Sequence, residues 1–440
     1  MEHKIMTHPA GSLKAGTLDP SFGEGGVLHL PIPEVSAAGA PGILALPNGK
    51  LLAVMPLLGV GAPMVVLRLN EHGTLDSTFG NSGTGYIELP ERGMHPNLLG
   101  INSLSDGGSI IGGRFGNDDD FGTIIIKLRE NGEFNSEFGN NGVVRLPIWG
   151  RKQQSEQGSE GESDSGKAEG NWRYSAIEDA NGKIVLVDQT YLTQGIRAIA
   201  IRLNVDGSLD DTFDRRTSIV ELPGVEYRWT TASGVTVQSD TKVLVCGHYG
   251  DEIQYGLYVV RFDSEGRVDP DFNNNRPIVI PLANTARFFS IAIGRSAGFE
   301  KILVVGESVE SDGTKGVLVV LNEQGSYDSA FNNGAPLFAT LYARNLTWTK
   351  CDWRPDGAIV VTGAVGHLDT SRNGVLTARY RPDGSLDPQF NDGVGYVVYE
   401  GIDGANVPED MVVMADERIV ISGFRVFGSS RQDWILRYLG

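Results

Sequence analysis

Four segments between residues 172 and 350 place aromatic and cationic side chains close together. Aromatic faces stack on sugar rings and other flat groups, and guanidinium groups form paired hydrogen bonds with carboxylates and phosphates. This combination suits the binding of a sugar, a small anionic molecule or an extended peptide. The candidate ligand-binding residues are Trp172, Arg173, Tyr174, Tyr227, Arg228, Trp229, Arg287, Phe288, Trp348 and Lys350.

Other patterns that could support chemistry have simpler explanations. Residues Gly294–Gly298 have the Gly-x-Ser-x-Gly form of a hydrolase elbow, but that motif needs a helix after the serine, and another strand is expected here. The acidic run Asn117–Asp120 lacks the spaced oxygen ligands and turn glycine of a calcium loop. The seven His residues are scattered, without a His-Glu-x-x-His motif or paired Cys. We therefore predict no catalytic residues, no metal site and no cofactor.

The elements that must position the candidate residues repeat seven times. Each copy reads Gly, any residue, an apolar residue, Asp or Asn, two residues, and Phe. The Phe residues are 57, 59, 75, 59, 59 and 59 residues apart, and a fixed period of this size indicates a repeat architecture. We expect the Asp or Asn to fix a turn and the Phe to fill the gap between adjacent units. These structural residues are Asp19, Phe22, Asp76, Phe79, Asn135, Phe138, Asp210, Phe213, Asp269, Phe272, Asp328, Phe331, Asp387 and Phe390.

Each repeat contains four short apolar runs rich in β-branched residues, which favours strands. A dipeptide such as Asn48-Gly49 or Asp356-Gly357 joins two of these runs and supplies the positive φ angles of a tight hairpin. Four-stranded units of this length predict an all-β fold, a seven-bladed β-propeller. Counted outward from the channel, strands A and B form the hairpin, C follows, and D comes after the Phe motif. The candidate residues then lie where strand A begins, around the channel mouth built by the D–A and B–C loops.

The strand order at the two ends of the chain predicts how the ring closes. The chain begins with a D-like run, Val27–Leu30, and ends with A, B and C runs. The N-terminal strand should therefore complete the last blade, a one-plus-three closure that leaves no open sheet edge. After a tail of residues 1–15, the single propeller at 16–440 divides into units 16–72, 73–131, 132–206, 207–265, 266–324, 325–383 and 384–440.

The one long spacing, between Phe138 and Phe213, reflects an insertion at residues 151–170. The insertion is rich in Ser, Glu and Gly and has no apolar anchor, which predicts a disordered polar loop between strands D and A. We interpret it as an inert insertion because long surface loops cost little free energy. A regulatory or docking role is the alternative.

The repeats resemble the delta-60 repeat family, a bacterial family of propeller-like repeats with a Gly-x-Leu-Asp-x-x-Phe-Gly signature. The resemblance covers nearly the whole chain, about residues 16–440. In the last four copies Asp214, Asn273, Asn332 and Asn391 replace the final Gly, and these residue types also tolerate a left-handed backbone. The resemblance implies a fold and carries no catalytic motif to this chain.

Composition excludes several classes of partner. The net charge of −18 argues against binding to nucleic acid or to anionic membrane surfaces. No stretch approaches the length of a membrane-spanning helix, and the N-terminus lacks the apolar run of a signal peptide. The two cysteines, Cys246 and Cys351, lie in different repeats and are expected to be buried thiols. We expect a soluble, monomeric, cytoplasmic protein, with export without a cleaved signal as the alternative.

These features favour a noncatalytic binding or scaffolding protein that recognises a protein, a glycan or a small anionic ligand at the D–A/B–C face. Two alternatives stay open: a propeller enzyme such as a lactonase, lyase or glycan-acting hydrolase that uses the central channel, and a secreted carbohydrate-binding protein or toxin component. The repeats place no ring of carboxylates or histidines at matching positions, which weighs against the enzyme. Packing between blades is the alternative explanation for the aromatic candidates.

Overall fold

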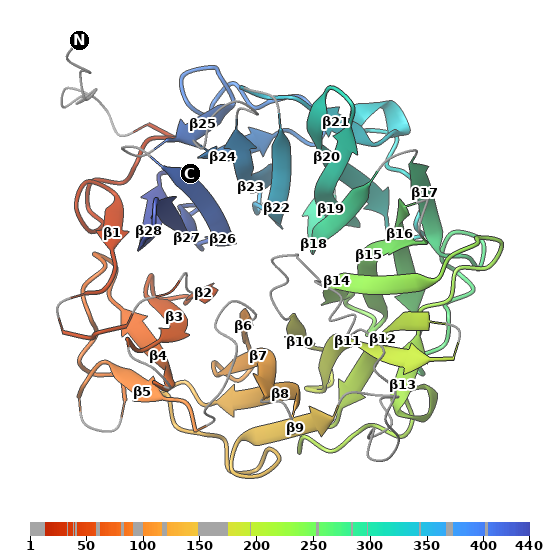
Figure 1. Cartoon of the computed structure of the whole chain (residues 1–440), viewed down its shortest axis with the longest axis horizontal. Helices are drawn as coiled ribbons and strands as arrows, with labels where there is room; N and C mark the ends of the chain where they lie inside the picture. Colours follow the sequence, from red (N-terminus) through yellow and green to blue (C-terminus); the bar gives the residue numbers. More distant parts are fainter. Residues whose placement is uncertain are drawn as a thin grey trace.

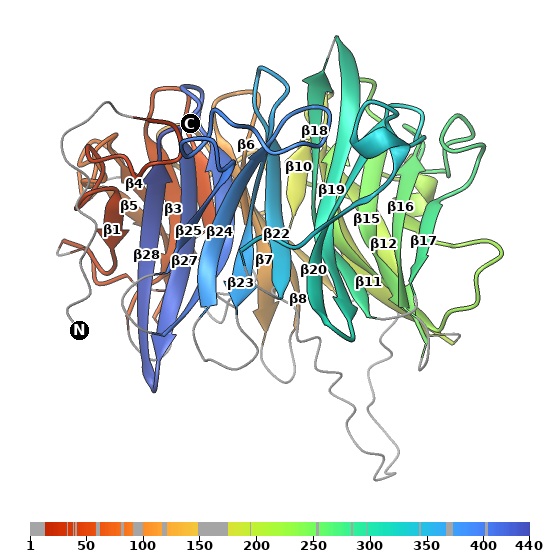
Figure 2. The ribbon, with the colours of Figure 1, turned by 90° about the horizontal axis from the view of Figure 1, so that it is seen from above.

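Seven four-stranded antiparallel sheets form a ring in the computed structural model of the chain (Figure 1). Seen from the side, the sheets stand next to one another as the blades of a propeller (Figure 2). The predicted seven-bladed β-propeller is therefore confirmed. The structure describes residues 14–32, 34–37, 39, 42–58, 62–80, 83–90, 100–116, 121–147, 175–193, 195–251, 255–282, 285–296, 298–342, 345–366, 373–400 and 404–440.

Blades 1 to 6 follow the chain order, and blade 7 combines both ends of the chain. The inner strands A of blades 1 to 7 are β2 (Gly42–Ala45), β6 (Gly100–Ser103), β10 (Ala176–Glu178), β14 (Trp229–Val237), β18 (Ala286–Ser296), β22 (Leu346–Trp353) and β26 (Ala405–Val413). Strands B are β3 (Leu51–Pro56), β7 (Ser109–Gly116), β11 (Ile184–Leu192), β15 (Val243–Gly250), β19 (Phe299–Glu310), β23 (Ile359–Gly366) and β27 (Ile419–Phe427).

The outer half of each blade has the same regular order. Strands C are β4 (Met64–Leu69), β8 (Phe121–Leu128), β12 (Gly195–Leu203), β16 (Tyr255–Phe262), β20 (Gly313–Asn322), β24 (Asn373–Tyr380) and β28 (Ser430–Tyr438). Strands D are β5 (Tyr86–Glu88), β9 (Val143–Pro147), β13 (Thr217–Ile219), β17 (Ile278–Leu282), β21 (Leu337–Ala339), β25 (Tyr396–Tyr399) and β1 (Val27–His29). Short 3-10 turns follow two motif Phe residues, at η2 (Asp214–Arg216) and η3 (Asn332–Gly334).

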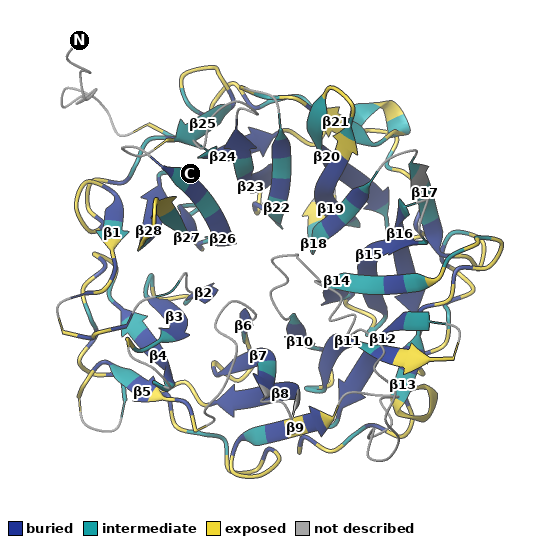
Figure 3. Cartoon of the chain, viewed as in Figure 1, coloured by how far each residue is buried: buried dark blue, intermediate teal, exposed yellow. Residues whose placement is uncertain are grey.

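The hydrophobic core is divided among the junctions between neighbouring blades. Each of seven apolar clusters joins residues of two adjacent blades, including the junction of blade 7 with blade 1. Between blades 2 and 3, for example, Ile110 and Ile125 pack with Leu186 and Ile199. Figure 3 shows this burial in the strands and exposure at the loops. Because both faces of every sheet are covered, each blade depends on its neighbours for stability.

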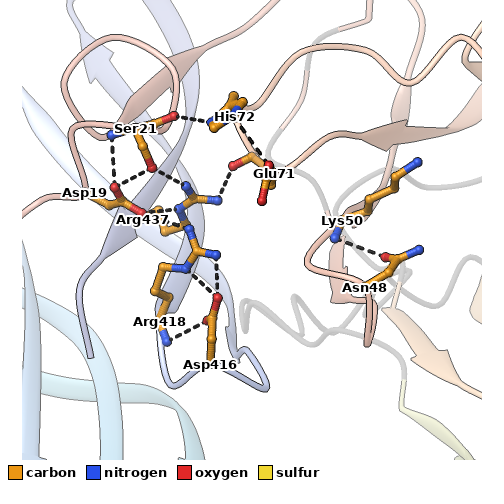
Figure 4. A network of polar contacts seen from close by, with 9 residues as sticks. All are labelled: Asp19, Ser21, Asn48, Lys50, Glu71, His72, Asp416, Arg418 and Arg437. Carbon is orange, nitrogen blue, oxygen red and sulfur yellow. Dashed lines mark hydrogen bonds and ion pairs between the residues drawn. The ribbon is translucent and has the colours of Figure 1, made fainter.

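The N-terminal strand closes the ring, as the sequence predicted. Strand β1 pairs antiparallel with β28, with Val27 opposite Leu436. Asp19, in the N-terminal segment, also accepts hydrogen bonds from Arg437 (2.9 Å) and Arg418 (3.2 Å) near the C-terminus (Figure 4). The Arg437 guanidinium reaches further, to the backbone carbonyl of Glu71 in blade 1. Backbone pairing and charge-assisted hydrogen bonds therefore close the ring together.

The repeated Asp joins the turn before strand D to strands B and C. In blade 3 Asp210 is 2 % exposed, and its Oδ1 accepts hydrogen bonds from the Thr212 N–H (3.0 Å) and hydroxyl (2.6 Å). Its Oδ2 accepts bonds from Arg202 Nε (2.7 Å) and Lys183 Nζ (2.8 Å). The Arg202 guanidinium also lies 4.5 Å from the centre of the Phe213 ring. One carboxylate thus fixes a turn and forms ion pairs with two cations.

A second cation, just before strand B or within its first residues, is a part of this arrangement that the sequence analysis did not include. It forms an ion pair with the motif Asp in five blades, through Lys50, Lys183, Lys242, Lys301 and Arg418. Gly108 in blade 2 and Ala358 in blade 6 occupy the same position without a charge.

Each motif Phe from Phe22 to Phe331 packs against the first Gly of the next motif along the chain. A Cβ atom added to Gly132 would lie 2.6 Å from the Phe79 ring, and one added to Gly325 would lie 2.6 Å from the Phe272 ring. These glycines also have φ angles of 89° and 86°, a left-handed conformation that is costly for other residues. The invariance of Gly across the seven copies therefore follows from both close approach and backbone conformation.

The inner strands are unequal around the ring. Those of blades 1 to 3 have three or four residues, whereas those of blades 4 to 7 have eight to eleven. Each of the four long strands contains a β-bulge near its first residues. A glycine of strand B stands opposite each bulge, at Gly247, Gly306, Gly363 and Gly423, where a Cβ would lie within 2.3 Å of a strand A carbonyl. Bulges redirect side chains and often lie next to functional sites.

Candidate ligand-binding mouth

Seven of the ten predicted candidates fall at the start of the long inner strands, at the D–A/B–C end of the channel. Trp172, Arg173 and Tyr174 lie outside the described residues. The other seven belong to the beginning of β14, β18 and β22 or to the segment just before β14. We call this region of blades 4 to 6 the mouth.

Two aromatic candidates are buried between blades. Trp348 and Phe288 are both 0 % exposed. The Trp348 indole packs over Gly316 of blade 5 and makes an edge contact with Tyr380, with ring centres 6.5 Å apart. Their rings therefore serve packing between blades and are not presented to a ligand, which corrects the sequence expectation for these two residues.

Tyr227 is also held by neighbouring side chains. Its hydroxyl donates a hydrogen bond to Glu221 (2.7 Å) and accepts one from the Leu222 N–H (3.1 Å). The Arg197 guanidinium lies 4.6 Å from the centre of its ring, and Tyr249 makes an edge contact at 6.3 Å. Burial and the adjacent Glu221 carboxylate raise the pKa of Tyr227 above its ordinary value. Tyr227 thus supports the wall of the mouth.

Trp229 stands in a partly exposed group of rings in blade 4. Its ring centre lies 5.6 Å from that of His248 and 5.7 Å from that of Tyr255. Thr231, on the same strand, is within 3.1 Å of a His248 ring nitrogen. Burial, together with the nearby Arg287 charge, lowers the pKa of His248 to about 3. His248 is therefore a neutral ring at physiological pH. Arg228, which precedes Trp229 in the chain, is exposed.

Arg287 places a cation beside this group from the neighbouring blade. Its side chain is 39 % exposed, and among the described residues its nearest carboxylate contact is a loose one of 3.8 Å with Glu307. Glu307 instead accepts a short hydrogen bond of 2.7 Å from the Thr347 hydroxyl of blade 6. Arg287 is therefore only partly neutralised at the mouth, where its guanidinium remains accessible to solvent.

Lys350 is engaged in a contact between blades. Its ammonium forms an ion pair with Asp410 of blade 7 (3.1 Å), and Asp410 also accepts a hydrogen bond from the Ile43 N–H of blade 1 (3.0 Å). This chain of contacts links three blades. Lys350 therefore contributes more to holding the inner ring together than to an open binding surface.

The structure also brings in residues that the sequence analysis missed. His248 and Glu307 occupy equivalent places on strands B of blades 4 and 5, each directly after a glycine that faces a bulge. The dipeptides Gly247-His248 and Gly306-Glu307 were the available signal, because they fall at the same distance from their repeat motifs.

Other candidates from the sequence have definite positions. Gly294 and Arg295 belong to β18, a strand that is followed by strand β19 and not by a helix. Asn117–Asp120 lie outside the described residues.

Both cysteines are free and buried, and burial raises the pKa of Cys351 to about 12. Among the described residues, no group of three or more His, Cys, Asp or Glu could hold a metal ion, and no helix could cross a membrane.

Comparison with known proteins identifies a fold and no activity. Two segments, residues 238–272 and 354–390, match the family described as "Domain of unknown function (DUF5122) beta-propeller". Each segment covers the strand B to Phe motif part of one repeat, which supports a propeller-type repeat family. No curated protein matches the chain.

Solved structures are similar at the level of the fold. The polysaccharide lyase Uly1 is 11 % identical with a TM-score of 0.46, covering 92 % of this chain and 90 % of that one. Drosophila Semaphorin 2a is 11 % identical with a TM-score of 0.48, covering 93 % and 76 %. The β-propeller domain of the Trilobed protease from Pyrococcus furiosus is 8 % identical with a TM-score of 0.41, covering 90 % and 98 %. These likenesses concern the fold alone, and two segments of the chain match a propeller repeat family of unknown function.

Proposed function

We propose that this protein is a noncatalytic binding propeller whose ligand, a protein, a glycan or a small anionic molecule, occupies the mouth beside blades 4 and 5. The observation that carries the proposal is the grouping of the Trp229 and Tyr255 rings around His248, together with the Arg287 guanidinium, whose charge acts on His248. Trp229, Tyr255 and Arg287 come from two neighbouring blades and remain at least partly exposed.

The surroundings of these residues favour binding. Trp229 and Arg287 belong to long β-strands, so they are held in place before a ligand arrives and lose little conformational freedom on binding. A partly exposed indole offers a flat face to a sugar ring or a peptide group. Arg287, whose contact with the Glu307 carboxylate is loose, can form paired hydrogen bonds with an anionic group.

Trp229→Ala and Arg287→Gln variants test the proposal against a ligand found by glycan array or small-molecule screening. We expect each substitution to weaken binding about 5- to 150-fold, because loss of a stacked ring or a charged hydrogen bond costs about 1–3 kcal/mol. The matched control is Phe299→Ala with Arg267→Gln, which changes an exposed ring and an exposed cation at the opposite, A–B/C–D end. Equal binding by all variants would remove the mouth as the site.

One observation favours the enzyme alternative. Burial raises the pKa of Asp352, on inner strand β22, to about 6. A carboxyl group with such a pKa can transfer protons near neutral pH. The enzyme alternative, a lactonase, lyase or glycan-acting hydrolase, predicts turnover that Asp352→Asn abolishes. If the protein only binds its ligand, binding should be saturable and no product should form. The same outcome is expected for a secreted carbohydrate-binding protein or toxin component.

A further inference from the structure

A small cavity lies between blades 5 and 6 at the D–A/B–C end. It opens where the B–C hairpin of blade 5 meets the segment that leads from β21 to β22, in the neighbouring blade (Figure 1). Its volume is about 230 Å³. Pockets for drug-sized ligands measure about 300–1,000 Å³, so this cavity suits a single small ring. Strand β19 stands between its β20 residues and Arg287 on β18.

Two residues at this cavity hold an unusual backbone conformation. Tyr342 and Asn345 have φ angles of 66° and 65°, in the left-handed region that bulky residues rarely adopt. The Asn345 Oδ1 accepts a hydrogen bond from the Thr314 N–H (3.0 Å), which ties this segment to the B–C hairpin. The Tyr342 hydroxyl donates a hydrogen bond to Glu400 of blade 6. Strained conformations persist where surrounding contacts hold them, and they cluster at ligand sites.

Tyr342 supplies the aromatic ring of the cavity lining. The residue is 52 % exposed, although the contact with Glu400 holds its hydroxyl. The ring is therefore fixed at one end and accessible to solvent before a ligand arrives. An aromatic face of this kind packs against the C–H face of a sugar ring.

The polar part of the lining supplies hydrogen-bond donors and acceptors together. Within the part of the chain that the structure describes, no hydrogen bond uses the Thr314 hydroxyl, the Thr340 hydroxyl or the Asn345 Nδ2 group. Asp312, at the tip of the hairpin, is exposed. A hydroxyl both donates and accepts, an amide Nδ2 donates, and a carboxylate accepts. This mixture matches the hydroxyl groups of a sugar, which also donate and accept.

The charges at the cavity favour a neutral ligand. The Lys315 ammonium in the lining forms an ion pair with Glu310 (2.5 Å), and the Asp312 carboxylate acts on the same ammonium. Two carboxylates thus surround one cation. An added phosphate or carboxylate would meet their repulsion, whereas an uncharged ring would not.

We propose that this cavity binds one neutral sugar ring, as a free monosaccharide or as a unit of a glycan. Tyr342 packs against the C–H face of the ring, and the side chains of Thr314, Thr340 and Asp312 bond its hydroxyl groups. The proposal does not rest on the proposed function, because the cavity lining shares no residue with the group of Trp229, Tyr255 and Arg287.

Saturation-transfer NMR on the intact chain tests the site with three neutral sugars and their uronates. The probes are glucose, galactose and mannose, and glucuronate, galacturonate and mannuronate, each titrated into the millimolar range. We expect saturable binding of at least one neutral sugar. The matching uronate should bind more weakly, because its carboxylate is repelled by Asp312 and Glu310.

Two variants remove different parts of the site. Tyr342→Ala removes the ring, and Thr314→Val/Thr340→Val removes both hydroxyls while it keeps the shape of the side chains. Each should weaken sugar binding about fivefold or more. Tyr191→Ala is the matched control, because it removes another exposed Tyr ring, near the B–C end of blade 3, and it should bind as the wild type does. Urea midpoints establish that all the proteins are folded.

Trp229→Ala separates this cavity from the mouth, and it should bind the sugar as tightly as the wild type does. Loss of sugar binding in Trp229→Ala, with binding retained in Tyr342→Ala, would place the sugar at the mouth and overturn this proposal while it supports the proposed function. The proposal is also overturned if none of the neutral sugars binds saturably, or if a uronate binds more tightly than every neutral sugar. Wild-type affinity in both Tyr342→Ala and the double Val variant has the same consequence.

Discussion

Asp210→Asn tests the account of how each blade is held together. The carboxylate of Asp210 is buried and accepts hydrogen bonds from Arg202 (2.7 Å) and Lys183 (2.8 Å). The substitution keeps the shape of the side chain but turns a donor toward both cations. Removing one partner of a buried ion pair costs about 3–5 kcal/mol, and we expect a loss of free energy of unfolding in that range. The urea midpoint should fall while the dependence on urea concentration stays the same.

The pH dependence gives a second signature of the same residue. Although burial raises it, hydrogen bonds from Lys183, Thr212 and Arg202 hold the pKa of Asp210 well below its ordinary value. The unfolded chain therefore binds more protons, and the stability from this residue is present above about pH 4 and lost as the pH falls further. The variant should show a flatter decline in acid than the wild type.

Asp211→Asn provides the control because this neighbouring carboxylate is exposed and, among the described residues, pairs with Arg216 at the surface. We expect a change of less than about 1 kcal/mol from it. A loss from Asp210→Asn no larger than that of the control would refute the reasoning. It would mean that the repeated carboxylate is a surface feature and not part of the core.

Two further predictions concern the inner ring and its closure. Asp352→Asn should stabilise the protein by about 1–2 kcal/mol at pH 7 but not at pH 4, measured as urea midpoints. The raised pKa of Asp352, about 6, means that the wild type loses stability as the pH rises from about 4 to 6, and the neutral Asn avoids this loss. The Asn side chain accepts one hydrogen bond fewer than the carboxylate, which offsets part of the gain. Deletion of residues 1–33 should lower the melting temperature because it removes β1 and the Asp19 contacts, and an unchanged melting temperature would contradict the closure.

Much of the fold could be predicted because its determinants lie within one repeat. The spacing of Phe22, Phe79 and their equivalents fixed the number of blades, and the order of strands at the two ends indicated the closure. The ion pair that precedes strand B escaped notice because Lys50 and Asp76 are 26 residues apart and meet only when the blade folds.

The mouth was predicted less well, for reasons that depend on the inner strands. The bulge between Trp348 and Lys350 interrupts the alternation of side chains, so the sequence pattern could not show that Trp348 turns into the junction with blade 5. Lys350 finds its partner, Asp410, in the next repeat, 60 residues away. His248 and Glu307 lie on strands B. The later residues of these strands reach the mouth because each B–C loop lies at the same end of the blade as the start of strand A.

The most direct test of the binding proposal compares the wild type with an Arg228→Ala/Trp229→Ala/Arg287→Ala variant in ligand binding measured by glycan array and by pull-down from lysate. The opposite-end variant Arg267→Gln/Phe299→Ala serves as the control, and urea midpoints establish that all three proteins are folded. We predict a ligand that the wild type and the control bind equally and that the mouth variant binds at least tenfold more weakly. Equal binding of that ligand by the mouth variant would contradict the proposal that the mouth of blades 4 and 5 is the working surface.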